Sequence, residues 1–272
     1  MIGAIRAEIL KVFTTRLWWG LLIALIVIDA GLSSLFGFLV GNDFGGGGDA
    51  GENPFLHHTV GTAQVVYAAG FIYFLSPLIP LALGVLLITS EFRHKTISAT
   101  FLSTPRRWQV VIAKLVAVGV VGAIYGVIHD LAASAGGGGV MAARGFDTYL
   151  TDPEVVKTFG LSLLAFICWM LIGYGFGVVI RNQIAATIVA IAFGFIIQIA
   201  LNIVFSVLGW DAAGKFLPSN LTLGMLVTSD PTMGQAAESP YFNWWQSALI
   251  LTGYGLLLSL IGSFITSRRD VA

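Results

Sequence analysis

The sequence has 272 residues, of which 57% are hydrophobic and only 10% are charged, and its mean hydropathy is +0.88. Soluble domains carry about a quarter charged residues, so this composition excludes a soluble globular protein and predicts an all-α, polytopic membrane protein. The formal net charge is zero, and a single cysteine, Cys168, excludes a disulfide framework and a cysteine-based metal site. The four histidines are too scattered to suggest a metal cluster.

The first sixteen residues alternate basic and apolar side chains. Their apolar residues fall on one helical face, which predicts an amphipathic helix over residues 1–16 that lies on the inner leaflet. The alternative is the basic start of a signal peptide. The apolar run that follows extends to Val40, which is too long for a signal-peptide core, so we expect a retained first span.

Six apolar runs reach the length of about 20 residues that a bilayer requires. They cover residues 17–40, 68–89, 110–135, 159–180, 184–208 and 244–265. In the second run, Pro77 and Pro80 should kink the helix. The third run is rich in glycine and alanine, and carries His129 and Asp130 near its predicted outer end.

The basic residues predict the orientation of these spans. The N-terminus, the loops after the second and fourth runs and the C-terminal tail hold eleven of the fourteen lysines and arginines. Because cytoplasmic loops carry the excess of Lys and Arg, both termini should face the cytoplasm. Residues 41–67 and 209–243 are then extracellular. The first contains a four-glycine tract typical of a flexible loop, and the second should form short amphipathic helices.

Residues 209–215 match most of the phosphate-loop pattern, but Phe216 stands where a Ser or Thr hydroxyl should hold magnesium. The motif also needs a preceding strand, and the predicted topology places it outside the cell. We therefore expect no ATP binding by this chain. No nucleophile elbow or metal-binding helix motif is present, which argues against an intramembrane enzyme.

A few polar side chains lie within the apolar runs. An intramembrane carboxylate is a functional candidate by default, so Asp29 is a candidate for a substrate path. Gln198 and Asn202 share one face of the fifth run and are as well suited to join helices as to contact cargo. The Gly122–Gly126 and Gly173–Gly177 spacings favour close helix packing.

The charged stretch between the second and third runs carries the most specific pattern. It contains Ser90-Glu91-Phe92-Arg93, Thr96-Ile97, Leu102-Ser103-Thr104-Pro105, Arg107 and Lys114. This order resembles the cytoplasmic loop of ABC type-2 exporter permeases, in which Glu-[Tyr/Phe]-Arg-x-x-Thr-[Ile/Leu] leads into Leu-x-x-Pro-x-[Arg/Ser] and then a Lys. The resemblance covers residues 90–114. The basic N-terminus, the six runs and the tight turn at residues 181–183 agree more loosely with the same family.

The resemblance implies a transport subunit rather than an enzyme. Residues 90–105 would form a coupling helix that docks on a separate ATPase subunit, with residues 181–183 as a smaller second contact. The implied contact residues are Glu91, Phe92, Arg93, Lys95, Thr96, Ile97, Phe101, Leu102, Arg181 and Asn182. ATP and magnesium would be bound only by the partner.

The resemblance also implies the assembly. Two ATPase subunits would bind two permeases, which are either identical or related, in the bacterial inner membrane. The cargo would be a hydrophobic or amphipathic compound such as a drug, an antibiotic, a peptide or a lipid. Two alternatives stay open. One is a proton-coupled secondary carrier that uses Asp29 or the His129–Asp130 pair, and the other is a membrane scaffold or sensor that moves nothing.

Overall fold

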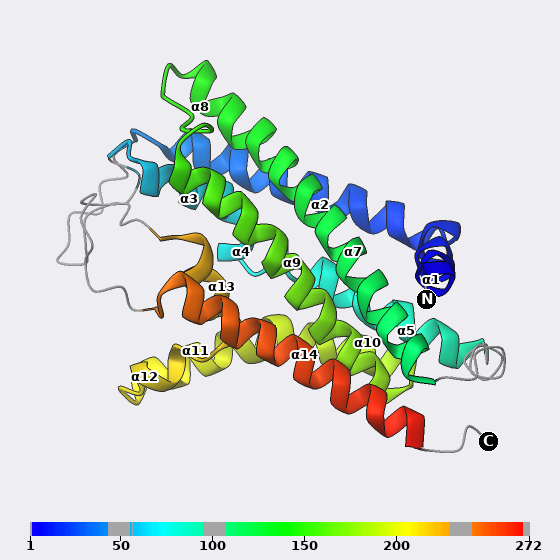
Figure 1. Ribbon diagram of the computed structural model, residues 1–272. Helices are drawn as coiled ribbons and strands as arrows, with labels where there is room; N and C mark the ends of the chain where they lie inside the picture. Colours follow the sequence, from blue (N-terminus) through cyan, green and yellow to red (C-terminus); the bar gives the residue numbers. More distant parts are fainter. Residues whose placement is uncertain (1, 43–54, 56, 95–106, 229–240, 269–272) are drawn as a thin grey trace.

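The computed structural model describes residues 2–42, 55, 57–94, 107–228 and 241–268, and every regular element in these ranges is helical (Figure 1). The elements are α1 (Ile2–Thr14), α2 (Leu17–Leu39), α3 (Val60–Tyr67), α4 (Ala69–Ile72), α5 (Leu78–Arg93), α7 (Arg107–Ala133), the π-helical turn η1 (Ser134–Gly138), α8 (Gly139–Ala143), α9 (Pro153–Ile180), α10 (Gln183–Ile191), the π-helical turn η2 (Ala192–Ile197), α11 (Gln198–Val207), α12 (Asp211–Gly214), α13 (Pro218–Leu226) and α14 (Trp244–Arg268).

Five helical stretches are long and apolar enough to cross a membrane. They are Leu17–Leu39, Trp108–Ala143, Pro153–Ile180, Gln183–Val207 and Trp244–Gly262. Each overlaps one of the six predicted spans, so the expected all-helical, multi-pass architecture is confirmed. The remaining predicted span, residues 68–89, is not among the five.

Residues 68–89 form two helices instead of one kinked helix. Helix α4 ends at Ile72, Phe74 has a φ of 57°, and α5 begins after Pro77. The residue before a proline disfavours helix, and proline itself cannot donate to a preceding turn, which explains why the chain breaks here. The backbone amides of Leu75 and Ser76 both donate to the carbonyl of Gly70 at 3.1 Å, so the buried break keeps its hydrogen bonds.

The third span is longer than predicted. The helix does not stop at Ala135 but continues through η1 and α8 to Ala143. Its glycines pack against α2, because a Cβ at Gly136 would clash with the carbonyl of Ala30, and one at Gly137 would lie 2.9 Å from the carbonyl of Ser33. The glycine run is therefore a packing surface, and His129 and Asp130 lie well inside the span instead of at its end.

Helix α9 forms the centre of the bundle, packed against α5, α7 and α14 (Figure 1). Close approach to these neighbours depends on glycine. A Cβ at Gly122 would lie 2.9 Å from the Cα of Ile167, and one at Gly177 would lie 2.9 Å from the carbonyl of Val85. Both predicted glycine pairs thus lie at helix interfaces, as expected for small residues in membrane proteins.

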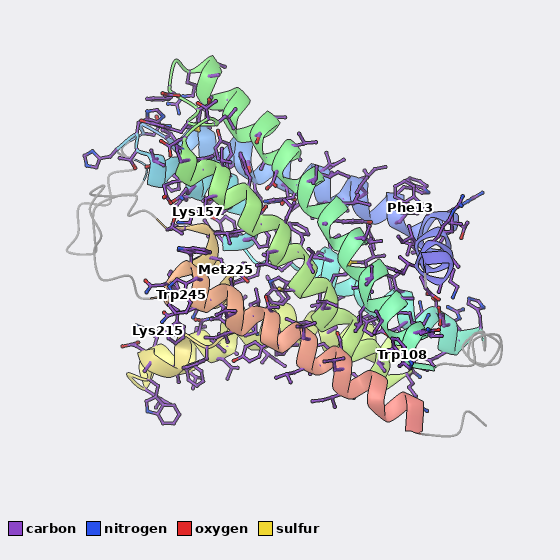
Figure 2. The ribbon with its side chains drawn as sticks, viewed as in Figure 1. Phe13, Trp108, Lys157, Lys215, Met225 and Trp245 are labelled. Atoms are coloured by element: carbon purple, nitrogen blue, oxygen red, sulfur yellow. The ribbon has the colours of Figure 1, made fainter. Side chains whose placement is uncertain are left out.

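The helix ends divide the molecule into two opposite ends. Helix α1, the end of α5, the start of α7 and the end of α14 gather at one end, whereas α3, α8 and α13 lie toward the other (Figure 1). Phe13 and Trp108 lie at the first end, and Lys157, Lys215 and Trp245 lie in the opposite half (Figure 2). We call the first the α1 end.

Residues 209–228 form the two short helices α12 and α13. Helix α13 packs against α9 and α14, and its Leu221 and Met225 are fully buried. Trp169 on α9 donates a hydrogen bond to Thr222 at 3.0 Å. This segment therefore contributes to the protein core. The expected short helices are present in the described part of residues 209–243, but most of α13 is buried, so it is not an amphipathic surface helix.

Candidate functional site

A groove at the α1 end brings together the two segments that were predicted to contact a partner. It has a volume of about 360 Å³ and is lined by Phe92, Arg93, Arg181, Asn182, Gln183 and Ile184. The first two residues end α5, Arg181 and Asn182 form the turn after α9, and the last two begin α10. Residues nearly ninety positions apart in the sequence thus share one surface.

Specific contacts hold the two arginines of this groove. The Nη1 atom of Arg93 donates to Oε1 of Gln183 at 3.3 Å, and the Arg181 guanidinium lies 5.6 Å from the centre of the Phe92 ring, within cation–π range. Both guanidinium groups line the groove, and no acidic residue of the described part of the chain lines it with them. The groove is therefore basic and accessible.

The turn that carries Arg181 is shaped by local backbone chemistry. Arg181 has a φ of 55° and ends α9, with its amide donating to the carbonyl of Gly177 at 3.1 Å. Asn182 then caps α10, because its side-chain oxygen accepts from the amide of Ala185 at 3.1 Å. Two helices therefore meet in a turn of two residues, which presents Arg181 beside α5.

Of the other predicted partner-contact residues, only Glu91 belongs to the described part of the chain. Lys95, Thr96, Ile97, Phe101 and Leu102 lie outside the described residues. Glu91 is described, but its carboxylate faces inward and the residue is only 7% exposed. The structure thus places it in a neighbouring charged cluster instead of in the groove.

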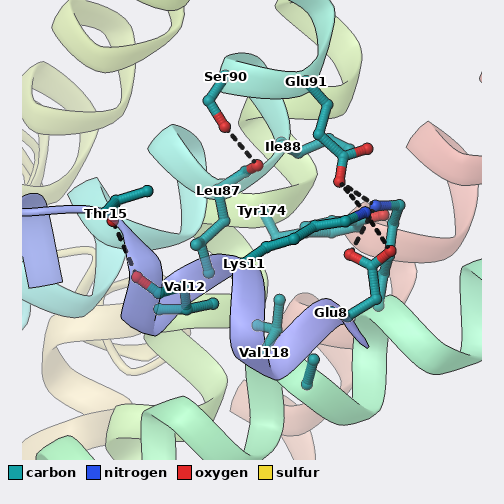
Figure 3. Close-up of a pocket in the computed structure, with 12 residues that line it drawn as sticks. Glu8, Lys11, Val12, Thr15, Leu87, Ile88, Ser90, Glu91, Val118 and Tyr174 are labelled. Atoms are coloured by element: carbon teal, nitrogen blue, oxygen red, sulfur yellow. Dashed lines mark hydrogen bonds and ion pairs between the residues drawn. The ribbon is translucent and has the colours of Figure 1, made fainter. Parts of the chain in front are cut away.

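That cluster joins three helices at the α1 end (Figure 3). The ammonium group of Lys114 on α7 lies 2.5 Å from Glu91 on α5 and 2.8 Å from Glu8 on α1. Lys11 on α1 completes it, at 2.6 Å from Glu8 and 3.1 Å from Glu91. Sequence reasoning singled out Glu91 and Lys114 but did not pair them, because they are 23 positions apart.

The two lysines of the cluster change the pKa of the Glu8 carboxyl. Burial acts to raise its pKa, but the ammonium groups of Lys114 and Lys11 outweigh burial and lower the pKa below its ordinary value of 4.5. Because the pKa of Glu8 is lower in the folded protein than in the unfolded chain, its charge stabilises the fold at any pH above the unfolded-state pKa. This stabilisation is lost as the pH falls through the folded-state pKa. The docking of α1 should therefore weaken in acid.

We expect a spin label at Leu10, whose side chain is exposed, to become more mobile as the pH falls below about 4.5, because protonated Glu8 no longer holds α1 to Lys114. Electron paramagnetic resonance of the purified protein in nanodiscs measures this mobility. In Glu8→Gln the label should already be mobile at neutral pH, with a smaller change on acidification. An unchanged neutral spectrum in Glu8→Gln would contradict the assignment.

The three candidates for a substrate path lie in two separate places. Asp29 is fully buried, accepts a hydrogen bond from the Ser76 hydroxyl, and lies 2.8 Å from His129 Nδ1. Gln198 instead accepts from the amide and hydroxyl of Ser219, and Asn202 donates to the carbonyl of Gln198 at 2.9 Å. The two amides thus join α11 to α13, and they share no partner with Asp29.

The structure also shows the surroundings of the phosphate-loop-like segment and of the possible metal ligands. The phosphate-loop-like segment follows helix α11 and forms the four-residue helix α12, with none of the strand–loop–helix geometry that phosphate binding needs. Within the described ranges, no group of three or more His, Cys, Asp or Glu side chains could hold a metal ion.

Comparison with known families agrees with this architecture. The profile of the family described as "ABC-2 family transporter protein" matches residues 5–271, which is nearly the whole chain. No curated protein sequence matches it. The family's members are multi-pass membrane permeases that bind ATP only through a partner ATPase. The chain therefore belongs to the ABC-2 family of transporters, as a permease subunit that does not itself hydrolyse ATP.

Proposed function

We propose that this permease is the membrane-spanning part of an exporter, and that the basic groove and the segment that follows it receive the ATPase. The observation that carries the proposal is that Phe92 and Arg93 adjoin Arg181 and Asn182 in one groove. The family resemblance of the sequence had implied both segments as partner contacts. Together with residues 95–105, which lie outside the described ranges, they would form the docking surface.

The charged cluster would couple a movement of this docking surface to the membrane-spanning helices. Residues 94–106 connect α5 to α7, so a displacement of the segment moves the ends of both helices. Glu91 and Lys114 tie these ends to each other and to α1, which should make the three helices move together. Helix α5 also packs along α9, so the displacement would reach the centre of the bundle.

The topology and assembly follow the same proposal. The α1 end would face the cytoplasm, with α4 and α5 together completing a sixth span of the bacterial inner membrane. Two ATPase subunits would act on two permeases, either two copies or a related pair. The largely apolar spans suit a hydrophobic or amphipathic cargo. Membership of an ATP-driven family favours this function over a proton-coupled carrier.

The test replaces Arg93 or Arg181 with alanine in the full chain, assembled with its ATPase subunits in liposomes. We expect each variant to lose ATP-driven transport by about tenfold or more, because unpairing a buried interfacial charge costs about 2–5 kcal/mol. Thermal stability of the permease alone should stay unchanged, since both side chains make few internal contacts.

Lys215→Ala is the charge-matched control, because Lys215 is half-buried directly after α12, in the opposite half of the molecule (Figure 2). It should transport normally. Wild-type transport in both arginine variants would refute the docking surface. ATP hydrolysis that no cargo stimulates in the wild-type assembly would favour the scaffold alternative instead.

A further inference from the structure

Polar side chains from three segments that are distant in the sequence contact one another in the buried interior. Asp29 comes from the middle of α2, Ser76 from the break between α4 and α5, and His129 from α7. The Ser76 hydroxyl donates to Oδ1 of Asp29, and His129 Nδ1 lies 2.8 Å from Oδ2. All three residues are at most 2% exposed. A carboxylate and an imidazole are thus in contact deep inside a candidate membrane span.

The surroundings of the pair are mostly apolar. The rings of Phe71 on α4 and Phe166 on α9 lie 5.0 and 5.1 Å from the His129 ring. Among the described residues, the charged groups that act on His129 are Asp29 and its neighbour Asp130. Asp130 itself accepts from the Ser162 hydroxyl at 2.5 Å. The protonation of this pair is therefore set by very few groups.

Burial makes the charge of the pair energetically important. A lone charge in a low-dielectric interior is costly, whereas a carboxylate beside a protonated imidazole is compensated. One proton on the pair thus permits tight burial. Loss of that proton leaves an uncompensated carboxylate and favours a state in which water reaches it.

The backbone beside the pair departs from regular α-helix in two places. The chain is non-helical at residues 73–77, and a π-helical turn begins at Ser134, five residues after His129. π-Helical turns are frequent at functional sites, and helices bend most sharply at π-helical turns and prolines. Gly70 lets the break approach Asp29, because a Cβ at Gly70 would clash with Asp29 and Ser76. The polar contact therefore lies between two irregular segments.

We propose that Asp29 and His129, with Ser76, form a proton-binding site that sets how tightly α2, α7 and the α4–α5 break stay packed. With the proton bound, the pair closes the contact between α2 and α7. Without it, the two helices separate at the level of Asp29. This site makes the conformation of the permease depend on pH, whether or not the ATPase is attached.

The test measures the distance between spin labels on the exposed residues Val27 of α2 and Leu131 of α7, in the full chain in nanodiscs with Cys168→Ala. As the pH rises from about 6 to about 9, through and beyond the range in which histidine ordinarily titrates, we expect a second, longer distance to appear. One linked proton changes the ratio of the two populations by up to about tenfold per pH unit. Double electron–electron resonance provides this ratio.

The Asp29→Asn/His129→Asn double variant should show one distance population at both pH values. His58→Asn, which removes a half-buried histidine bonded to the Asp147 carbonyl, should keep the wild-type response. A wild-type distance that does not change with pH, or a response that survives in the double variant, would overturn the proposal.

A second measurement does not depend on whether the double variant folds. In a variant with His57, His58 and His94 all replaced by asparagine, His129 is the sole histidine. Its imidazole nitrogens, observed by ¹⁵N NMR, should titrate over the same pH range as the distance change. An imidazole signal that stays constant across the range would also overturn the proposal.

Discussion

Gly173→Ala is expected to destabilise the protein by about 3 kcal/mol or more, which is the upper part of the range for overpacked cores. The reason is geometric, because a Cβ at Gly173 would clash with the carbonyl oxygen of Leu81 on α5. Backbone atoms cannot move aside as a flexible side chain can. Helices α5 and α9 would have to separate, and α7 and α14 also pack on α9.

Gly160→Ala is the matched control on the same helix. A Cβ at Gly160 would have no heavy atom within 4 Å, and alanine favours helix over glycine by about 1 kcal/mol. This variant should therefore be as stable as the wild type or slightly more stable. Thermal unfolding of the two purified variants, followed by size-exclusion chromatography in detergent, compares them directly. Equal melting temperatures would show that the α5–α9 interface tolerates a methyl group.

Composition and local pattern were sufficient for the parts of this fold that depend on neighbouring residues. Apolar length predicts the five candidate spans, because a bilayer requires about 20 apolar residues whatever the neighbouring helices are. The tight turn at residues 181–183 was also predicted, and its Asn182 cap is a local interaction. Both features follow from short stretches of sequence.

Features that depend on tertiary contact were missed. The sequence predicts that the third span ends at Ala135, before the run of glycines at 136–139, and glycine is a poor helix former. In the structure these glycines remain helical, because their lack of side chains lets α2 approach. The complete break at residues 73–77 was likewise expected to be only a kink, and its buried amides depend on the Gly70 carbonyl.

The pairing of charged residues also depends on tertiary contact and could not be predicted from the sequence. Asp29 and His129 are a hundred positions apart, and Glu8 and Lys114 are similarly distant, so no local spacing could pair them. One signal was available in each case, because a charged residue in or beside an apolar run needs a partner. That rule predicts that a partner exists but does not identify it.

The charged cluster at the α1 end leads to the second large effect. Lys114→Met should cost about 3–5 kcal/mol, the usual range when one member of a buried ion pair is removed. It leaves Glu8 and Glu91 to share Lys11, and the side chain of Lys11 is 44% exposed. The side chains of Lys114 and Glu91 are only 7% and 8% exposed, so solvent compensates little of the loss.

The Glu91→Gln/Lys114→Met double variant should recover most of this stability, because Glu8 and Lys11 then remain as a balanced pair. Thermal unfolding of the two singles and the double variant forms a double-mutant cycle. The more solvent-accessible pair Glu154–Lys157 is the matched comparison, and its cycle should give at most about 1 kcal/mol.

A double variant as unstable as Lys114→Met would mean that Glu91 is held by other contacts. The expected recovery would instead identify Glu91 as a positioning residue, which acts by fixing α5 to α1 and α7 and not by touching the ATPase. Loss of transport in a Glu91 variant would then report a loosened cluster. Arg93, which is exposed in the groove beside it, is therefore the residue whose removal tests contact with the ATPase.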